Sequence, residues 1–97
     1  MNKVYIITFN TDEPFNMVTF HDYITSLYPN KIIDWWHYIH TTYLIVSPLD
    51  VNSLYNLIFP GVPQRYLLVV EIDPNNAQGW LPPDAWKWLQ KYQGFKK

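Results

Sequence analysis

The spacing of hydrophobic residues along this chain changes several times between the period of a strand and the period of a helix. Residues 3–9 are rich in β-branched and aromatic side chains, which predicts a first strand. Asn16 is then a candidate N-cap of a helix that residues 28–30 end. Between these limits, hydrophobic residues recur three or four positions apart, as on one face of a helix: Met17, Phe20, Ile24 and Leu27.

The middle of the chain predicts two further strands and a second helix. Residues 31–39 and 42–47 are the two strands, joined by a tight connection at His40 and Thr41. The helix follows Asp50, which is a second candidate N-cap. Its buried face is expected to consist of four hydrophobic residues: Val51, Leu54, Leu57 and Ile58.

The last part of the chain completes the element order. Residues 65–72 predict a fourth strand, and residues 83–92 predict a short helix with two prolines at its entry, where proline is tolerated. The order is therefore β-α-β-β-α-β-α, and its first six elements match the ferredoxin-like pattern. We expect one domain over residues 1–97, of the α+β class: a ferredoxin-like βαββαβ fold with an antiparallel four-stranded sheet and an extra C-terminal helix.

The strands carry apolar residues on both sides, although a sheet with one solvated face should alternate apolar and polar residues. In the fourth strand, one side carries Tyr66, Leu68, Val70 and Ile72, and the other carries Leu67, Val69 and Glu71. We therefore expect the face opposite the two helices to be covered by the C-terminal helix, by a second subunit, or by both. A homodimer or larger homo-oligomer is the partner that this pattern favours.

Composition narrows the classes of function. Aromatic residues make up 19% of the chain and charged residues only 15%, so either the rings build a large shared core or some of them face a partner or a flat ligand. A net charge of −1 argues against nucleic acid, which needs a basic face. The absence of cysteine excludes disulfides and thiolate zinc sites. No apolar run is long enough for a membrane span, and the first residues predict a strand rather than a signal peptide, so we expect a cytoplasmic protein.

Residues 34–38, with the sequence DWWHY, form the densest group of candidate binding residues. On a strand, Trp35 and His37 share one face, whereas Trp36 and Tyr38 share the other. One hypothesis is a wall of rings that stacks a planar ligand, with a hydrogen bond from His37; such stacking contributes about 1–3 kcal/mol per nucleobase. The alternative is that one face belongs to the core and the other to a subunit interface, where Trp and Tyr are enriched.

The C-terminal segment, residues 79–89, contains three of the five tryptophans. It is either a hydrophobic clamp that docks the last helix on the sheet, or a site in which Trp86 or Trp88 borders a pocket with Lys87 or Lys91.

Metal chemistry has weak support in the sequence. His37 and His40 have the spacing of a metal pair, but residues three apart on a strand point to opposite faces, so we expect no metal site and no cofactor. His21 is expected at the surface. The carboxylates of Asp12 and Glu13 are expected to belong to a turn rather than to a Mg²⁺ site.

Two stretches resemble a known family: DWWHYI with TYLIV after it (residues 34–39 and 42–46), and LLVVEI followed by GWLP and WKWL (residues 67–72, 79–82 and 86–89). Together they resemble the small bacterial and phage proteins labelled the SinR family, which are similar in fold to the dimeric CRISPR-associated adaptation protein. That resemblance implies a ferredoxin-like fold. Relatives linked to metal-dependent nuclease activity have an Asp at the end of the first strand, where this chain has Asn10.

We expect a non-enzymatic, small oligomeric binding protein that sequesters a nucleotide-derived signal, in the style of phage proteins that blunt host immune signalling. No glycine-flanked serine and no glycine-rich phosphate loop is present. The alternatives are a protein-interaction module or inhibitor with an aromatic surface, and a nuclease-like nucleic-acid-binding protein. The candidate ligand-binding residues are Asn10, Trp36, His37, Tyr38, His40, Arg65, Trp80, Trp86 and Lys87.

Overall fold

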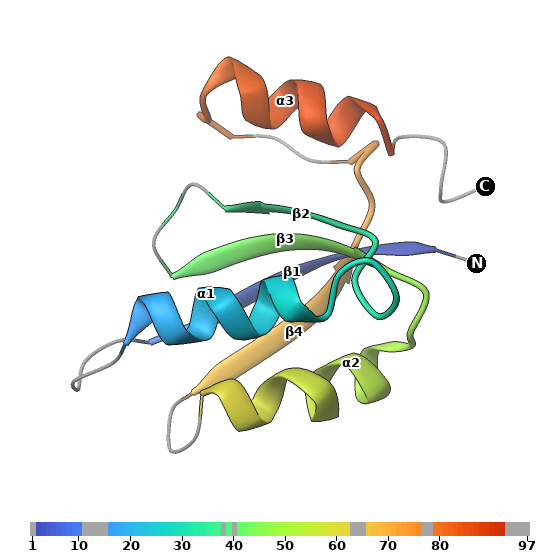
Figure 1. Ribbon diagram of the computed structural model, residues 1–97. Coiled ribbons are helices and arrows are strands. Elements are labelled where there is room, and N and C mark those ends of the chain that lie inside the picture. Colours follow the sequence, from blue (N-terminus) through green and yellow to red (C-terminus); the bar gives the residue numbers. More distant parts are fainter. Residues whose placement is uncertain are drawn as a thin grey trace.

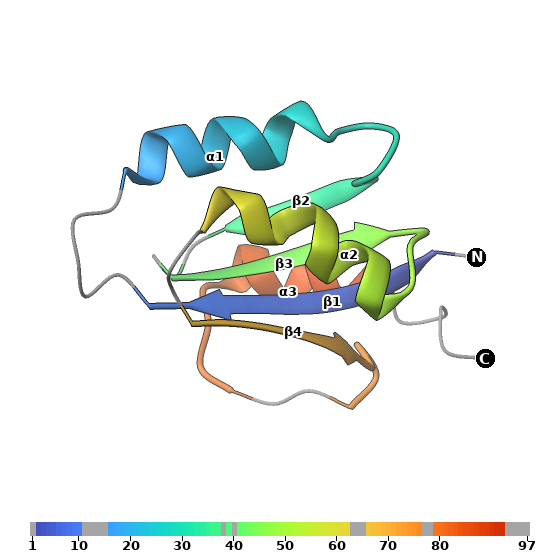
Figure 2. The same ribbon diagram turned by 90° about the horizontal axis from the view of Figure 1, so that it is seen from below.

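The computed structural model describes residues 2–10, 16–37, 39, 41–62, 66–76 and 79–92, and shows three layers. Helices α1 and α2 cover one face of a sheet, and α3 lies on the other face (Figures 1 and 2). The elements follow in the order β1 (Lys3–Phe9), α1 (Met17–Ser26), β2 (Asp34–His37), β3 (Thr42–Ser47), α2 (Val51–Ile58), a short 3₁₀ helix (Phe59–Gly61), β4 (Leu67–Ile72) and α3 (Pro83–Gln90).

The four strands form one antiparallel sheet in the order β2-β3-β1-β4. β1 is central: it pairs with β3, where Tyr5 lies opposite Ile45, and with β4, where Ile7 lies opposite Val69. The two edges of the sheet are β2 and β4. The predicted α+β class and antiparallel four-stranded sheet are therefore confirmed, and the arrangement is consistent with the ferredoxin-like pattern.

Both predicted helix caps are confirmed. The Oδ1 atom of Asn16 accepts a hydrogen bond from the backbone N–H of Thr19 at 3.0 Å, and Oδ1 of Asp50 accepts one from Ser53 at 2.7 Å. Each bond satisfies an N–H group that the first helical turn leaves without a backbone partner. Most residues of the predicted helix faces lie in or against the core, namely Met17, Phe20, Ile24, Leu27, Leu54 and Ile58. Val51 is exposed and Leu57 is only partly buried.

The second strand is shorter than residues 31–39. The backbone N–H groups of Lys31 and Ile32 donate to the carbonyl of Leu27, at 2.9 and 3.0 Å, and so form a turn that closes α1. The fully buried hydroxyl of Ser47 holds this turn, because it donates to the Lys31 carbonyl at 2.6 Å and accepts from the N–H of Leu49 at 3.1 Å. Strand pairing therefore begins only at Asp34.

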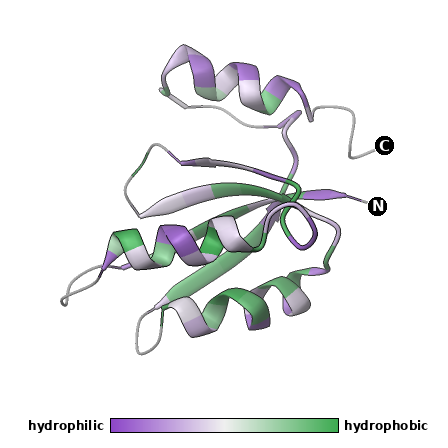
Figure 3. Ribbon diagram, in the orientation of Figure 1, coloured by the Kyte–Doolittle hydropathy of each residue, from purple (hydrophilic) through white to green (hydrophobic). Residues whose placement is uncertain are grey.

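Hydrophobic side chains form a core on each side of the sheet. Figure 3 shows that β1, β3, β4 and much of α2 are hydrophobic, whereas α3 is largely hydrophilic. The core under α1 and α2 contains Tyr5, Ile7, Phe9, Phe20, Ile24, Ile32, Tyr43, Ile45, Leu54, Ile58 and Val62. The core under α3 contains Val4, Leu44, Val46, Trp88 and Leu89, with Ile6, Trp36, Ile72, Trp86 and Tyr92 packed against it.

A polar contact fastens the end of α3 to β2. The hydroxyl of Tyr92 donates to Oδ2 of Asp34, and Nζ of Lys91 lies 3.4 Å from the same oxygen. The N–H of Trp35 donates to Oδ1 of Asp34 at 2.8 Å. Burial by itself raises the pKa of Asp34, but these hydrogen bonds and the charge of Lys91 outweigh it and lower the pKa. In the segment with three tryptophans, Trp88 lies in the core under α3 and Trp86 packs against it, as the docking interpretation predicted, whereas Trp80 is completely exposed.

The outer surface of β4 differs from the rest of that face because it is exposed. Leu68 and Val70 expose 58% and 39% of their surface, and Tyr66, just before the strand, exposes 84%. Within one chain, α3 therefore covers part of this face and leaves β4 uncovered; cover of β4 by a second subunit stays a prediction.

Candidate ligand pocket between α1 and β2

A shallow, widely open pocket of about 320 Å³ lies between the first helix and the second strand. Met17, Val18, His21 and Asp22 line it from α1, and His37 lines it from β2. Its volume is near the lower limit of small-molecule sites, about 300–1,000 Å³. The pocket therefore has room for one planar ring system rather than for a large ligand.

One of the lining residues, His37, belongs to a stacked pair of rings. The imidazole of His37 lies parallel to the phenol ring of Tyr43, with centroids 4.0 Å apart and an interplanar angle of 5°. Tyr43 is fully buried and packs on Phe9 and Phe20, so its position is set by the core. The core thus places His37, which remains partly exposed, in a fixed orientation at the pocket.

His21 joins the same cluster from the helix. Its Nδ1 atom lies 2.7 Å from the hydroxyl oxygen of Tyr43, and its ring packs edge-on against Trp35 at 4.9 Å. Burial raises the pKa of Tyr43 to about 12, so the hydroxyl keeps its proton at neutral pH and can donate to Nδ1. A neutral His21 then carries its own hydrogen on Nε2.

His21, expected at the surface, is partly exposed, but its ring also packs on Trp35 and Tyr43 of the sheet, which was not expected. The helical spacing of His21 in the sequence already indicated this contact with the sheet. His21 lies four residues after Met17 and three before Ile24, so it belongs at the border of the predicted buried face. What the sequence could not show is that this border faces Tyr43 and His37.

The pocket combines ring faces with a few polar groups. Met17 and Val18 offer apolar contact, the two imidazoles offer hydrogen bonds and stacking, and Asp22 offers a carboxylate acceptor. None of the described lining residues is Lys or Arg. Within the ranges that the structure describes, no three His, Cys, Asp or Glu side chains come together as a possible metal site.

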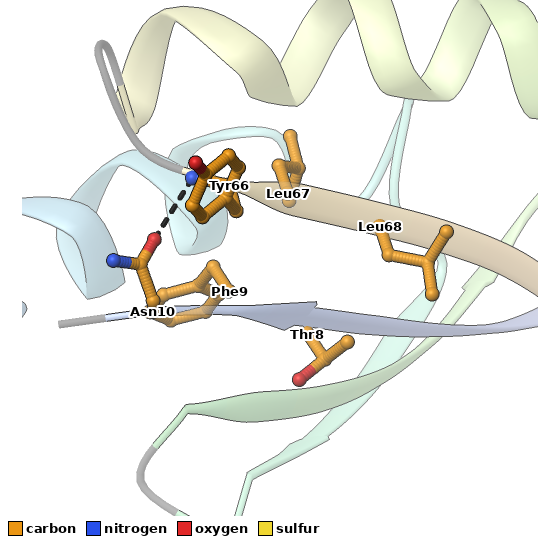
Figure 4. A pocket seen from close by; sticks show the side chains of 6 residues that line it. All are labelled: Thr8, Phe9, Asn10, Tyr66, Leu67 and Leu68. Atoms are coloured by element: carbon orange, nitrogen blue, oxygen red, sulfur yellow. Dashed lines mark hydrogen bonds between the residues drawn. The ribbon is translucent and has the colours of Figure 1, made fainter.

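A second pocket, also of about 320 Å³, lies where β1 and β4 meet (Figure 4). It is lined by Thr8, Phe9, Asn10, Tyr66, Leu67 and Leu68. Oδ1 of Asn10 accepts a hydrogen bond from the N–H of Tyr66 at 2.8 Å, and the N–H of Asn10 donates to the carbonyl of Tyr66 at 3.4 Å. Asn10 therefore extends the β1–β4 ladder by one pair, which is a structural task.

The candidate ligand-binding residues do not meet at one place. His37 lies at the first pocket and Asn10 at the second. Trp36 and Trp86 pack in the core under α3, on the opposite face from His37. Lys87 and Trp80 are exposed, and Trp80 completely so. Tyr38, His40 and Arg65 lie outside the described residues.

Comparisons with known proteins leave the family open: no family model, no curated protein and no solved structure matches this chain. The resemblance to the SinR family therefore stays a prediction. In the part of the chain that is described, no helix has the length and apolar character needed to cross a membrane.

Proposed function

We propose that this protein is a non-enzymatic binding protein, built on a ferredoxin-like fold, that holds a planar ring in the pocket between α1 and β2. The observation that carries the proposal is the stack of His37 on Tyr43 at 4.0 Å, beside a pocket that His21 and Asp22 also line. The buried phenol orients the imidazole in advance, so a ligand does not have to order it.

The chemistry of the pocket favours a nucleobase as the ring. Hydrogen bonds to the edge of a base and stacking on its face are the two contacts that imidazoles provide. Asp22 would repel a phosphate, and no described lining residue offsets that charge. We therefore place the base or nucleoside part of a nucleotide-derived signal in this pocket, with its phosphates outside. Sequestration of such a signal, as by a phage protein that blunts immune signalling, is the role that follows.

Calorimetric titration of the full chain with nucleosides and the matching nucleotides tests the proposal. We expect nucleosides to bind, and the nucleotide to bind no more tightly than its nucleoside. His37→Leu retains an apolar side chain but removes the ring, and should weaken binding at least about tenfold, the scale of one lost stacking contact. Trp80→Ala removes a fully exposed ring elsewhere and should leave binding unchanged. Binding that is lost with Trp80 and kept without His37 would contradict the pocket.

A protein-interaction module is the second candidate, because Trp80 is completely exposed and Trp is enriched in binding hot spots. Trp80 does not line the proposed ligand pocket, so ligand binding there does not explain why its ring is exposed. If Trp80 anchors a partner, the Trp80→Ala variant should lose a protein that co-purifies with the unmodified chain, whereas His37→Leu should keep it.

A further inference from the structure

We infer that the β4 edge of the sheet, together with the adjoining side of α2, is the contact surface for a second copy of this chain. The surface lies away from the ligand pocket, on the opposite edge from β2. It goes beyond the proposed function, which needs only one copy.

The backbone of β4 has hydrogen-bonding groups directed outward. Tyr66 exchanges hydrogen bonds with Asn10 at the end of β1, so the backbone groups of Tyr66 point towards β1. Residues in an antiparallel ladder alternate in this respect. The N–H and C=O groups of Leu67 and Val69 therefore point away from β1, to the edge of the sheet. No described strand lies beyond β4 on that side (Figures 1 and 2), and such an edge pairs readily with another strand.

The neighbouring helix presents apolar side chains on the same side. Val51, Tyr55 and Phe59 lie four residues apart and expose 38%, 38% and 43% of their surface. The rings of Tyr55 and Phe59 contact each other, with centroids 5.7 Å apart.

The direction of this stripe follows from the contacts of α2. Leu54 and Ile58 face the sheet. The hydroxyl of Tyr23 on α1 donates to the carbonyl of Leu57 at 2.5 Å, which places α1 on the Leu57 side of α2. At 100° per residue, the stripe formed by Val51, Tyr55 and Phe59 lies on the opposite side, away from α1. Because α2 packs against β4, that side is the β4 edge.

The β4 edge and the apolar stripe of α2 suit a second copy of this chain, because a two-fold axis places each of them against the same surface of the other copy. Antiparallel pairing of β4 with β4 extends the sheet, and it places the two α2 helices side by side on one face with their apolar stripes in contact. A register centred on Val69 sets Leu68 opposite Val70 of the second copy. It also separates the two Glu71 carboxylates by four residues, about 13 Å along the strand. A register centred on Val70 would instead bring the two Glu71 residues within about 7–8 Å of each other, where like charges repel.

The size of the surface indicates a reversible dimer. An aromatic side chain offers about 150–250 Å², so the partly exposed stripe and the strand supply roughly a few hundred Å² per copy. Stable complexes bury about 800 Å² per partner. We therefore expect sedimentation velocity on the full chain to show monomer at low micromolar concentration and dimer towards millimolar concentration.

Cysteine cross-linking tests the register, since the chain has no cysteine of its own. Residues opposite each other in a pair without backbone hydrogen bonds have Cα atoms about 4.5 Å apart, within disulfide range. A mixture of Leu68→Cys and Val70→Cys proteins should form a disulfide dimer under a mild thiol oxidant, and neither protein alone should do so comparably. Val18→Cys, at an exposed position on α1, replaces Leu68→Cys in the control mixture and should not cross-link.

The contact through α2 has its own test. Tyr55→Glu should shift the dimerisation midpoint at least tenfold to higher concentration, whereas Val18→Glu, at a residue that is 70% exposed on α1, should not. A chain that stays monomeric at every concentration would overturn the inference. Efficient cross-linking of Leu68→Cys alone would overturn the register, because it would place Leu68 opposite itself.

Discussion

The imidazole of His37 lies flat on the phenol ring of Tyr43, 4.0 Å away and within 5° of parallel. The two residues come from neighbouring strands, and they are directly opposite each other in the β2–β3 register. Cross-strand pairs of this kind stabilise a sheet. Here the pair also joins the hydrophobic core, through the buried phenol, to a solvent-accessible pocket, through the imidazole. Stability and the proposed ligand binding would therefore depend on the same contact.

Alkaline titration should reveal the burial of Tyr43. Its pKa is raised to about 12, so the folded state favours the protonated phenol. The stability from this effect is complete below the ordinary tyrosine pKa of about 10, and is lost as pH rises from about 10 to about 12. Absorbance of tyrosinate should show a late-ionising fraction that Tyr43→Phe reduces. Burial also raises the pKa values of Tyr5 and Tyr92, so part of the late fraction should remain.

Acid should weaken the attachment of α3 to β2. The pKa of Asp34 is lowered in the folded state, so its stabilising effect is complete above about pH 4 and is lost as pH falls through the folded pKa. Asp34→Asn should lower the free energy of unfolding near neutral pH by about 1.5–3 kcal/mol, the scale of hydrogen bonds to a charged group. Urea unfolding near pH 6 and near pH 3 measures both effects. The difference in unfolding free energy between the unmodified protein and Asp34→Asn should shrink at the lower pH. A difference that does not change with pH would refute the role of the charge.

Gly61→Ala should destabilise the packing of α1 against the end of α2. A Cβ atom at Gly61 would lie 2.9 Å from Cδ2 of Tyr23 and 3.1 Å from Cδ1 of Phe20. Phe20 is buried, so the neighbours cannot move freely, and overpacking of this kind costs about 1–3 kcal/mol. Gly79→Ala is the matched control, because a Cβ atom there meets nothing within 4 Å. Thermal unfolding should separate the two variants, and equal midpoints would contradict the close approach.

Ser47→Ala should cost about 1–3 kcal/mol of unfolding free energy. The substitution leaves the carbonyl of Lys31 and the N–H of Leu49 without the hydroxyl that satisfies them beside a fully buried side chain. Ser26→Ala removes a hydroxyl that is bonded to the carbonyl of Tyr23 on the exposed side of α1. That control should change the free energy by no more than about 0.5 kcal/mol. Chemical denaturation of both variants tests the difference, and a neutral Ser47→Ala would show that water replaces the bonds.

By itself, the sequence determined the class and the order of the elements. Strand and helix periods, together with the caps Asn16 and Asp50, act over a few residues and can be recognised without knowing the rest of the fold. The start of the second strand was not determined in this way: the sequence predicted residue 31, and the strand begins at Asp34. The turn after α1 takes residues 31 and 32 from the predicted strand, and the hydroxyl of Ser47 that holds this turn comes from a distant position in the chain.

Only the tertiary structure decided which chemical groups meet. The sequence placed Trp36 and His37 side by side as candidates, but the sheet sends one ring under α3 and the other to the pocket. The fold also brings His21 next to Tyr43, which lies 22 residues later in the chain, through a hydrogen bond that local spacing cannot predict. The exposed surface of β4 has the same origin, because strand order makes β4 an edge. Local preferences depend on neighbours along the chain, whereas a binding surface depends on contacts between distant segments that only the folded chain brings together.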